Sequence, residues 1–421
     1  MTDPVPSPSP RVPRRRGRRL AATLTALAAL LVGGYAAACA LAPLPAPALA
    51  VSGAAEQRID ADPAAVQAAV DAQPRPTAAG WLDGEEIWVN SEEPAPIASI
   101  SKLVTVLVAL EAAPLEAGSE GPVHVWTAED RERTEEYLAE DGVAYPIPVG
   151  TEVTTRQMLM LALIPSANDF AAAYAASVFG DTASFVAAVD DWAQRHGLDS
   201  LTLFEPTGMD ERNAASPADV LRVARLALGD ETVAEIVSMP EADLPWGIGT
   251  VESTNPLFGA LPGIRGLKTG RTSIAGYNLA SAQAGEASGR ALVKLAVVLG
   301  RDTANARFAD SVAVLAALDA APQAIDVVAA GEEIGVATTV DGIRVPLVAA
   351  GAAEAVLIPG ESATRTATLA ELGVGDAGQR AGAVAVTAPS GDGDVPVVTT
   401  AEIAEPGFWW RVAHPARLFG G

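Results

Sequence analysis

Cysteine, histidine and lysine are all scarce in this chain of 421 residues. The single cysteine, Cys39, lies in an apolar N-terminal run, so we expect no disulfide in the folded part. The three histidines, His124, His196 and His414, are scattered without the spacing of metal ligands, which argues against a zinc site. Their number does not exclude a Ser-His-Asp triad, but none of them stands in a motif. We therefore expect no metal and no cofactor.

Positive charge is outnumbered, with 28 basic against 52 acidic residues. Six of the arginines and one aspartate lie in residues 1–19, so the remainder holds 22 basic and 51 acidic residues, a net charge of −29. Such acidity argues against nucleic acid as a partner and favours a soluble surface. The length allows two domains, each with its own core.

One long uncharged run stands near the N-terminus, at residues 20–42. Its 23 residues are enough to span a bilayer, and the preceding arginines would keep residues 1–19 in the cytoplasm. Residues 42–50 end in an Ala-x-Ala pattern, which also fits cleavage of a signal peptide. A retained membrane anchor and a cleaved signal, each with a linker up to residue 50, therefore both remain open. In either case we expect the rest of the chain outside the cytoplasm, in the cell envelope.

The chain contains only three lysines, Lys102, Lys268 and Lys294. Arginine cannot deprotonate in proteins, so a site that transfers protons is one place where lysine cannot be replaced. Lys102 interrupts an almost wholly apolar stretch that predicts a buried helix, and Ser99 precedes it by one helical turn. Burial favours a neutral amine, which can take a proton from a serine hydroxyl. The alternative is a solvated lysine at the start of a helix.

Up to Pro322 the pattern of apolar and turn residues predicts a mixture of helices and strands. A hairpin with an Asp-Gly turn is expected at residues 77–90, and an acidic, irregular surface loop at residues 121–150. The remaining expected elements are helices at residues 154–163, 170–179, 185–196, 217–228 and 307–318, and strands at residues 267–281 and 290–300.

After Pro322 the composition changes. Residues 325–403 are rich in valine, broken by glycine and aspartate, and show no convincing helix, which predicts a small all-β domain at residues 325–405. The preceding domain is expected at residues 56–322. Residues 406–421 form an aromatic and basic tail. This tail is either a membrane-interface patch or the end of an element that packs on the β domain.

Three short motifs occur in order along the chain, namely Ser99-x-x-Lys102, Ser166-x-Asn168 and Lys268-Thr269-Gly270. Each is weak alone, because Ser-Ala-Asn is often a helix N-cap and Lys-Thr-Gly is often a turn. Together they resemble the penicillin-binding serine transferases. Their flanks are similar to those of the D-alanyl-D-alanine carboxypeptidases among the low-molecular-mass penicillin-binding proteins, over roughly residues 75 to 405. These flanks are Ile97-Ala-Ser-Ile-Ser-Lys-Leu103, Leu163-Ile-Pro-Ser-Ala-Asn-Asp169, Gly266-Leu-Lys-Thr-Gly-Arg-Thr-Ser-Ile-Ala-Gly-Tyr-Asn-Leu279 and Arg307-Phe-Ala-Asp-Ser311.

The resemblance implies an α+β fold, in which a β-lactamase-like catalytic domain with an antiparallel sheet flanked by helices precedes a small all-β, sandwich-like domain. It implies a serine-type enzyme that removes the terminal D-alanine from peptidoglycan stem pentapeptides ending in D-Ala-D-Ala, with β-lactam antibiotics as covalent inhibitors. Ser99 would be the nucleophile and Lys102 its general base. Ser166 and Lys268 would form a second proton path, and Asn168 would orient Lys102 and the substrate amide.

The resemblance also implies a set of substrate-binding residues around the third motif. These are Thr269, Gly270, Arg271, Thr272 and Arg307. Hydroxyl groups and a guanidinium suit the terminal carboxylate of such a substrate. The oxyanion hole would be the N–H of Ser99 and one near Thr272. Arg271 either assists an anionic substrate, lowers the pKa of Lys268 or points to solvent.

Alternatives within and outside this class remain. A peptidoglycan endopeptidase or a β-lactamase would use the same motifs. A class A β-lactamase would also need a glutamate to activate the deacylating water, and no Glu-x-x-x-Asn stretch that carries it stands between Ser166 and Lys268, which argues against the β-lactamase. A non-catalytic wall-binding module is the alternative of a different class. The presence of all three motifs argues against that module.

Overall fold

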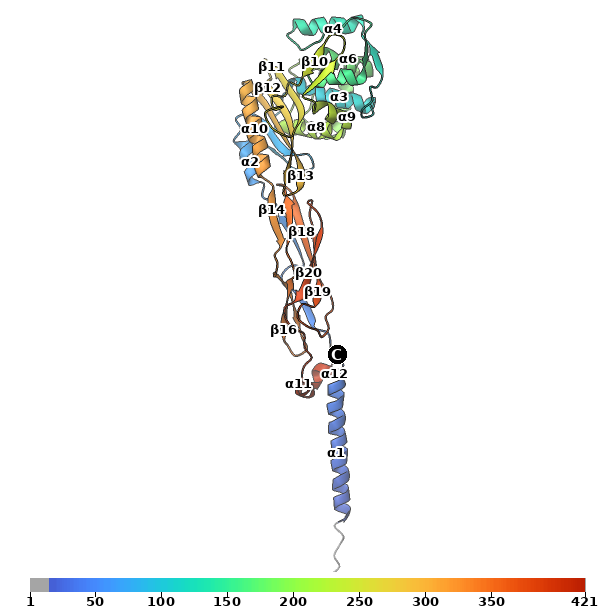
Figure 1. Ribbon diagram of the computed structural model, residues 1–421, viewed down its shortest axis with the longest axis vertical. Coiled ribbons are helices and arrows are strands. Elements are labelled where there is room, and N and C mark those ends of the chain that lie inside the picture. Colours follow the sequence, from blue (N-terminus) through green and yellow to red (C-terminus); the bar gives the residue numbers. More distant parts are fainter. Residues whose placement is uncertain (1–14, 421) are drawn as a thin grey trace, which may run out of the picture.

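Two antiparallel sheets follow one another along the long axis of the molecule in the computed structural model, which describes residues 15–420 (Figure 1). A long helix extends from the end opposite the first sheet. Residues 1–14 of the expected cytoplasmic segment lie outside the described residues. The first sheet carries the motifs singled out above, and the second sheet separates it from the long helix.

The first sheet has five strands in the order β11 (Ile264–Thr272), β12 (Gly276–Ala287), β13 (Arg290–Arg301), β3 (Thr77–Trp81) and β4 (Ile87–Val89). The predicted hairpin at residues 77–90 is confirmed, because β3 and β4 pair antiparallel. The single strand expected at residues 267–281 is wrong, since the chain turns back at residues 273–275 to form the β11–β12 hairpin. Alternation of side chains continues through this turn, so the sequence pattern hides it.

Helices cover both faces of this sheet. Alternate residues of β13 face two cores, with Leu295 and Val297 in one and Ala296 and Val298 in the other. On the second face lie α2 (Ala64–Asp71) and α10 (Ala304–Ala320). The first face carries α3 (Ser101–Ala112), α5 (Thr155–Leu163), α6 (Asn168–Phe179), α7 (Thr182–Arg195), α8 (Pro217–Gly229) and α9 (Glu231–Val237). The fold is thus α+β with a central antiparallel sheet, as predicted.

Helix α3 is the buried centre of the first face, with every residue from Ser101 to Leu110 buried. This agrees with its apolar sequence on all sides. The 3₁₀ turn η1 (Ala98–Ile100) leads directly into it. Short paired strands close the loops around it, namely β5 (Ala95–Pro96) with β8 (Ala214–Ala215), β6 (Val123–Val125) with β7 (Glu152–Thr154), and β9 (Glu241–Leu244) with β10 (Gly249–Glu252).

The irregular loop expected at residues 121–150 contains a helix, α4 (Ala128–Ala139), so that prediction was wrong in part. Thr127 and Asp130 form a capping box at its start. The helix has almost no apolar face, and only Asp130 and Thr134 are buried. Ion pairs one turn apart, such as Arg131 with Glu135, support it instead. Hydrophobic periodicity therefore gave no signal of a helix.

The second sheet has seven strands and its own apolar core. Their order is β1 (Ala48–Val51), β15 (Glu333–Thr338), β16 (Arg344–Ala349), β20 (Gly393–Thr399), β19 (Arg380–Thr387), β18 (Ser362–Leu369) and β2 (Glu56–Asp60), with β14 (Gln323–Val328) and β17 (Ala353–Leu357) as a separate pair. The two edge strands, β1 and β2, come from the N-terminal side of the chain. The sequence had assigned β1 to a linker and β2 to the start of the catalytic domain. Strands of four and five residues are too short for sequence periodicity to reveal.

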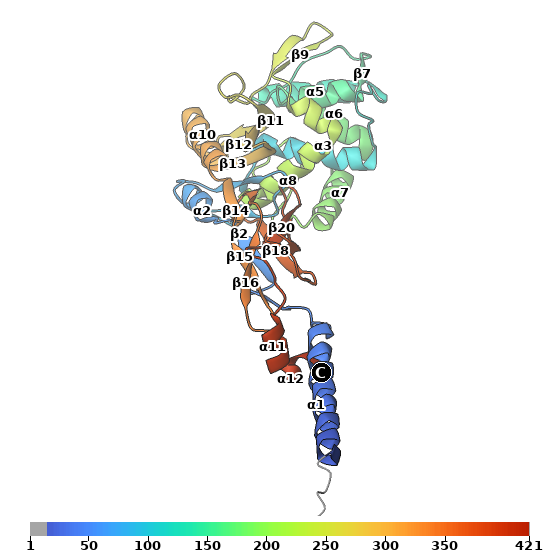
Figure 2. The same cartoon turned by 60° about the horizontal axis from the view of Figure 1, so that its bottom comes forward.

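The long helix is α1 (Arg15–Leu41), and the tail forms two short helices, α11 (Phe408–Ala413) and α12 (Pro415–Phe419). In residues 15–420, α1 is the one unbroken helix that is long and apolar enough to cross a membrane. Both tail helices lie beside the end of α1 nearest the second sheet (Figure 2). The tail thus packs on α1, an arrangement that the sequence did not suggest.

Candidate active site

Ser99 and Lys102 meet where η1 passes into α3. Ser99 is partly buried in the 3₁₀ turn, and Lys102 is fully buried in the first turn of the helix. The amine Nζ of Lys102 lies 2.8 Å from Ser99 Oγ, 2.6 Å from Asn168 Oδ1 and 2.7 Å from the carbonyl oxygen of Thr207. The three partners match the three N–H bonds of an ammonium group. A neutral amine keeps its bonds to Asn168 and Thr207 and accepts a hydrogen bond from the Ser99 hydroxyl.

The environment brings the pKa of Lys102 close to neutrality. Burial lowers this pKa to about 7, while the carboxylates of Glu205 and Asp169 oppose the shift. A substantial fraction of the amine is therefore neutral at physiological pH. Because its lone pair then points at Ser99 Oγ, the pair can pass a proton without moving.

The second motif lies on the loop that enters α6. Ser166 is buried there with a left-handed backbone (φ 74°), which is unusual for a residue with a side chain. Asn168 begins α6, and its backbone N–H donates to the carbonyl oxygen of Val143 at 2.7 Å. A Cβ atom on Gly142 would lie 2.6 Å from Asn168 Nδ2, so only glycine fits at this contact. The segment after α4 is thus held against the second motif.

Asp169 strengthens that connection. Its buried carboxylate accepts hydrogen bonds from the Thr134 hydroxyl of α4 and from the Tyr145 backbone N–H. Burial raises the pKa of Asp169 to about 7. The polar segment 121–150 is therefore attached to the site through the residue that follows Asn168, which the sequence did not indicate.

The third motif runs along β11, the edge strand that passes the Ser99 turn. Lys268 is buried, and burial together with the charges of Lys102 and Arg307 lowers its pKa well below the ordinary value. Its Nζ donates to the carbonyl oxygen of Thr269. A Cβ atom on Gly270 would lie 2.5 Å from the Ile97 carbonyl oxygen and 3.2 Å from Ser99 N. The glycine lets β11 approach the nucleophilic serine closely.

The substrate-binding residues expected on the hairpin lie in different surroundings. Thr269 Oγ1 shares a hydrogen bond with Thr254 Oγ1, and Thr272 Oγ1 accepts one from the backbone of Ala275. The exposed guanidinium of Arg271 lies 5.1 Å from the ring centre of Tyr277. A cavity of about 570 Å³ opens beside it, lined by Glu140, Asp141, Met209, Glu211, Arg271, Thr272, Ser273 and Ile274. Arg271 thus forms part of a cavity wall.

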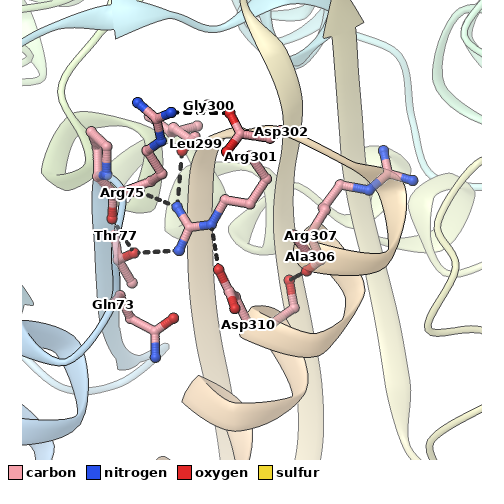
Figure 3. Close-up of polar contacts among 12 residues, drawn as sticks. Gln73, Arg75, Thr77, Leu299, Gly300, Arg301, Asp302, Ala306, Arg307 and Asp310 are labelled. Carbon is pink, nitrogen blue, oxygen red and sulfur yellow. Dashed lines mark hydrogen bonds and ion pairs between the residues drawn. The ribbon is translucent and has the colours of Figure 1, made fainter.

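Arg307 reaches the same region from α10. At the end of β13, buried Arg301 donates to Thr77 Oγ1 and to the carboxylate of Asp310 on α10, which fixes α10 against the sheet (Figure 3). The side chain of Arg307 points away from this network. Its guanidinium lies 5.6 Å from the Tyr277 ring centre, and its Nε is buried without a hydrogen-bond partner. An unpartnered cationic donor suits an anionic group of a ligand.

Glu205, Thr207 and Gly208 belong to the site but were not singled out from the sequence. The carboxylate of Glu205 accepts hydrogen bonds from the backbone N–H groups of Thr207, Gly208 and Asp210, at 2.7, 2.6 and 3.3 Å. The turn held in this way presents the Thr207 carbonyl oxygen to Lys102. Glycine after proline and threonine signals a turn, but nothing in the sequence indicates what the turn contacts.

Substitution of Gly208 by alanine is expected to destabilise the fold by roughly 2–4 kcal/mol. Gly208 has φ 87°, and an added Cβ would lie 2.0 Å from the carbonyl oxygen of Ala98, immediately before Ser99. Gly180→Ala is the matched control, because Gly180 has φ 84° but nothing within 4 Å of its Cβ position. Urea unfolding should show a cost of about 1 kcal/mol for the control. Equal costs for the two variants would show that the turn does not press on Ala98.

Comparisons with known proteins fit this geometry. The sequence model of the D-alanyl-D-alanine carboxypeptidase family, peptidase S11, matches residues 88–303. The carboxypeptidase DacF of Bacillus subtilis is 31% identical over 224 residues, which are 52% of this chain and 54% of that protein. A D-alanyl-D-alanine endopeptidase of Pseudomonas aeruginosa is 33% identical over 135 residues, 32% of this chain and 40% of that protein. The chain thus spans about half, or less, of these relatives' length.

Solved structures show the same fold over a longer stretch. Penicillin-binding protein 5 from Haemophilus influenzae superposes with a TM-score of 0.54 at 21% identity, covering 79% of this chain and 97% of that one. The carboxypeptidase DacD from Francisella tularensis gives 0.53 at 15% identity, covering 79% and 94%. The predicted penicillin-binding serine transferase fold is therefore confirmed. Since the family match covers more than half of the chain and includes all three motifs, the protein belongs to the D-alanyl-D-alanine carboxypeptidase family.

Proposed function

We propose that the protein is a serine-type D-Ala-D-Ala carboxypeptidase, which removes the terminal D-alanine of peptidoglycan stem pentapeptides and is acylated by β-lactams. The observation that carries this proposal is the contact of 2.8 Å between Ser99 Oγ and a buried amine with a pKa of about 7. Such a pair makes a nucleophile and its base from residues that are unreactive in water. The family match supports the substrate class.

Acylation begins when neutral Lys102 takes the proton of the Ser99 hydroxyl. Ser99 Oγ then attacks the carbonyl carbon of the penultimate D-alanine, and the N–H groups of Ser99 and of β11 near Thr272 stabilise the oxyanion. The C–N bond breaks, and the proton that Lys102 took from Ser99 passes by way of Ser166 and Lys268 to the amine of the departing D-alanine. The depressed pKa of Lys268 suits this exchange, because two neighbouring buried amines do not readily hold protons together. Water then cleaves the ester on Ser99.

Recognition of the terminal carboxylate falls to β11 and α10. Thr269 and Thr272 offer hydroxyl groups, Gly270 keeps the strand close to Ser99, and Arg307 supplies a guanidinium with an unpartnered Nε. Arg271, on the wall of the adjoining cavity, would attract an anionic peptide. Together these groups favour a substrate that ends in a free carboxylate.

The family and the relatives' names support action on the cell wall, outside the cytoplasm. Export requires the apolar helix α1, either as a signal or as an anchor. We propose that the folded part acts in the cell envelope, close to the membrane that α1 enters.

The test is to incubate the full-length protein with a D-Ala-D-Ala pentapeptide and with cross-linked peptidoglycan fragments, and to identify the products. Release of free D-alanine that pre-incubation with penicillin abolishes would support the proposal. A peptide ending in L-Ala-L-Ala controls for nonspecific hydrolysis. Two relatives are named endopeptidases, so cleaved cross-links without D-alanine would favour that activity. Rapid hydrolysis of penicillin would indicate a β-lactamase, and no adduct at all would indicate a non-catalytic binding module.

Replacement of Glu205 by glutamine is expected to shift the acid limb of the pH–acylation profile to lower pH, by roughly 0.5 to 1 unit. Burial lowers the pKa of Lys102, whereas the negative charges of Glu205 and Asp169 raise it. Lys268 is the other charged neighbour of Lys102. Loss of the charge therefore extends the neutral base to lower pH. The rate of fluorescent penicillin acylation between pH 5 and 8 measures this shift.

Glu211→Gln serves as the control for that measurement. Glu211 is exposed on the wall of the neighbouring cavity and makes no contact with Lys102, so its profile should match that of the parent protein. An unchanged profile in Glu205→Gln, with an intact fold, would mean that Glu205 only shapes the turn.

A further inference from the structure

The Ala-x-Ala pattern that suggested signal cleavage lies inside a strand. Residues 48–51 form β1, which pairs with β15 at every residue from Ala48 to Val51. Cleavage after Ala50 would remove three of the four residues of this strand and expose the edge of β15. The segment that a peptidase would remove is therefore part of the second sheet.

The last turns of α1 are bound to the tail of the chain. Arg411, on α11, is buried and donates through Nη1 to the carbonyl oxygens of Ala40 (2.9 Å) and Ala42 (3.3 Å). These carbonyl groups lie at and just beyond the helix C-terminus, where acceptors lack intrahelical partners and a cation is favoured. Tyr35 returns the contact, since its hydroxyl donates to the carbonyl oxygen of Val412.

From Gly17 to the end of α1, burial is confined to this contact. Cys39 is fully buried, and Ala36 and Ala40 on the same helical face are partly buried, whereas the leucines nearer the N-terminus are exposed. Only a small share of the apolar span is covered by protein, 6% of an 18-residue window. A soluble protein does not leave such a helix in water, so another apolar medium must cover it.

The tail carries exposed aromatic side chains next to the C-terminal end of α1, where the helix is covered by protein. Phe408, Trp409 and Phe419 are 45%, 79% and 58% exposed, and they belong to α11 and α12, the helices that lie beside the outer end of α1 (Figure 2). Of the two arginines in residues 406–421, Arg417 is exposed, whereas Arg411 is buried and paired with Glu405 at 2.7 Å. Aromatic rings with basic neighbours are typical of the membrane–water interface.

We propose that α1 remains attached as a membrane anchor, and that residues 406–419 form a collar around its outer end, seated in the headgroup layer of the bilayer. The 20 residues from Leu20 to Cys39 span about 30 Å, which matches the hydrocarbon core. Arg18 and Arg19 then lie at the inner face and the collar at the outer face. The collar holds the second sheet directly at the membrane, independently of any enzymatic activity.

The first measurement is the intact mass of the full chain recovered from bacterial membranes. The proposal expects a protein that retains residues 1–50, apart from its initiator methionine. A mature N-terminus at Val51 would overturn the anchor, whatever the activity assays show.

Cys39, the only cysteine, reports on the collar in the protein reconstituted into nanodiscs of phosphatidylcholine and phosphatidylglycerol. The parent should react slowly with a small maleimide, whereas Arg411→Ala should react roughly 10-fold faster because the cover over Cys39 opens. Arg417→Ala changes a neighbouring arginine outside the contact and should behave like the parent. Equal rates in the parent and Arg411→Ala would show that Arg411 does not hold the collar against α1, and would overturn that part of the proposal.

Lipids brominated at different depths test the position of the collar. The difference between the fluorescence of the parent and that of Trp409→Phe gives the emission of Trp409 alone, because the other six tryptophans are present in both proteins. Shallow bromines should quench that signal more strongly than deep ones. No quenching by either lipid would place the collar in water and overturn its proposed seat in the bilayer.

Discussion

Exchange of Ser99 for alanine is expected to abolish covalent labelling by fluorescent penicillin and to lower D-alanine release by about 10⁴-fold or more. Ser99 Oγ is the atom that would accept the acyl group, and Lys102 Nζ lies 2.8 Å from it. Alanine removes the nucleophile but leaves Lys102 its contacts with Asn168 and Thr207. Intact mass after incubation with penicillin measures the adduct directly.

Ser101→Ala is the matched control for this variant. Ser101 is fully buried two residues away, and its hydroxyl donates to the Ala98 carbonyl oxygen and accepts from Asn213 Nδ2. Its loss should cost about 1–2 kcal/mol of stability and leave labelling intact. An adduct on Ser99→Ala would place the nucleophile elsewhere, and a labelling defect in Ser101→Ala alone would show that the backbone turn, rather than Ser99, limits the reaction.

Sequence reasoning reached the parts of the site that are close in the chain or chemically distinctive. Ser99 and Lys102 are one helical turn apart, so their contact follows from local geometry. The scarcity of lysine identified Lys268 as well, and the structure buries it near Lys102. The helix that carries Ser99 and Lys102 was predictable because it is apolar on every face.

Contacts that join distant segments were not accessible in this way. The Thr207 carbonyl oxygen that accepts a hydrogen bond from Lys102 stands 105 residues away, and any residue type offers a carbonyl group. Asp169 joins α6 to α4 through a polar helix that has no hydrophobic period. The pairing of β1 with β15 joins segments that are far apart in the chain. Such features depend on the packed structure and leave little trace in local composition.

Exchange of Lys102 for arginine is expected to slow acylation by about 10³-fold or more. The comparison applies only if the variant unfolds at nearly the same temperature as the parent protein. Arginine retains the positive charge and donors for Asn168 and Thr207, but it cannot take a proton from Ser99. The parent protein should show an acid limb near pH 7, because protonation of Lys102 below its pKa of about 7 removes the base. The residual rate of the variant should lack this limb, since the Lys102 amine whose protonation causes it is gone.

Lys294→Arg is the matched control, because Lys294 is also buried and is paired with Asp319 outside the site. Its ion pair needs a cation but no proton transfer, so arginine should preserve both the rate and the pH profile. If Lys102→Arg kept more than about a tenth of the parent rate, general-base catalysis by Lys102 would be excluded. Loss of activity in Lys102→Arg together with full activity in Lys294→Arg would show that the reaction needs a buried amine able to lose its proton at residue 102. That requirement would explain why lysine is retained there in a chain that otherwise uses arginine.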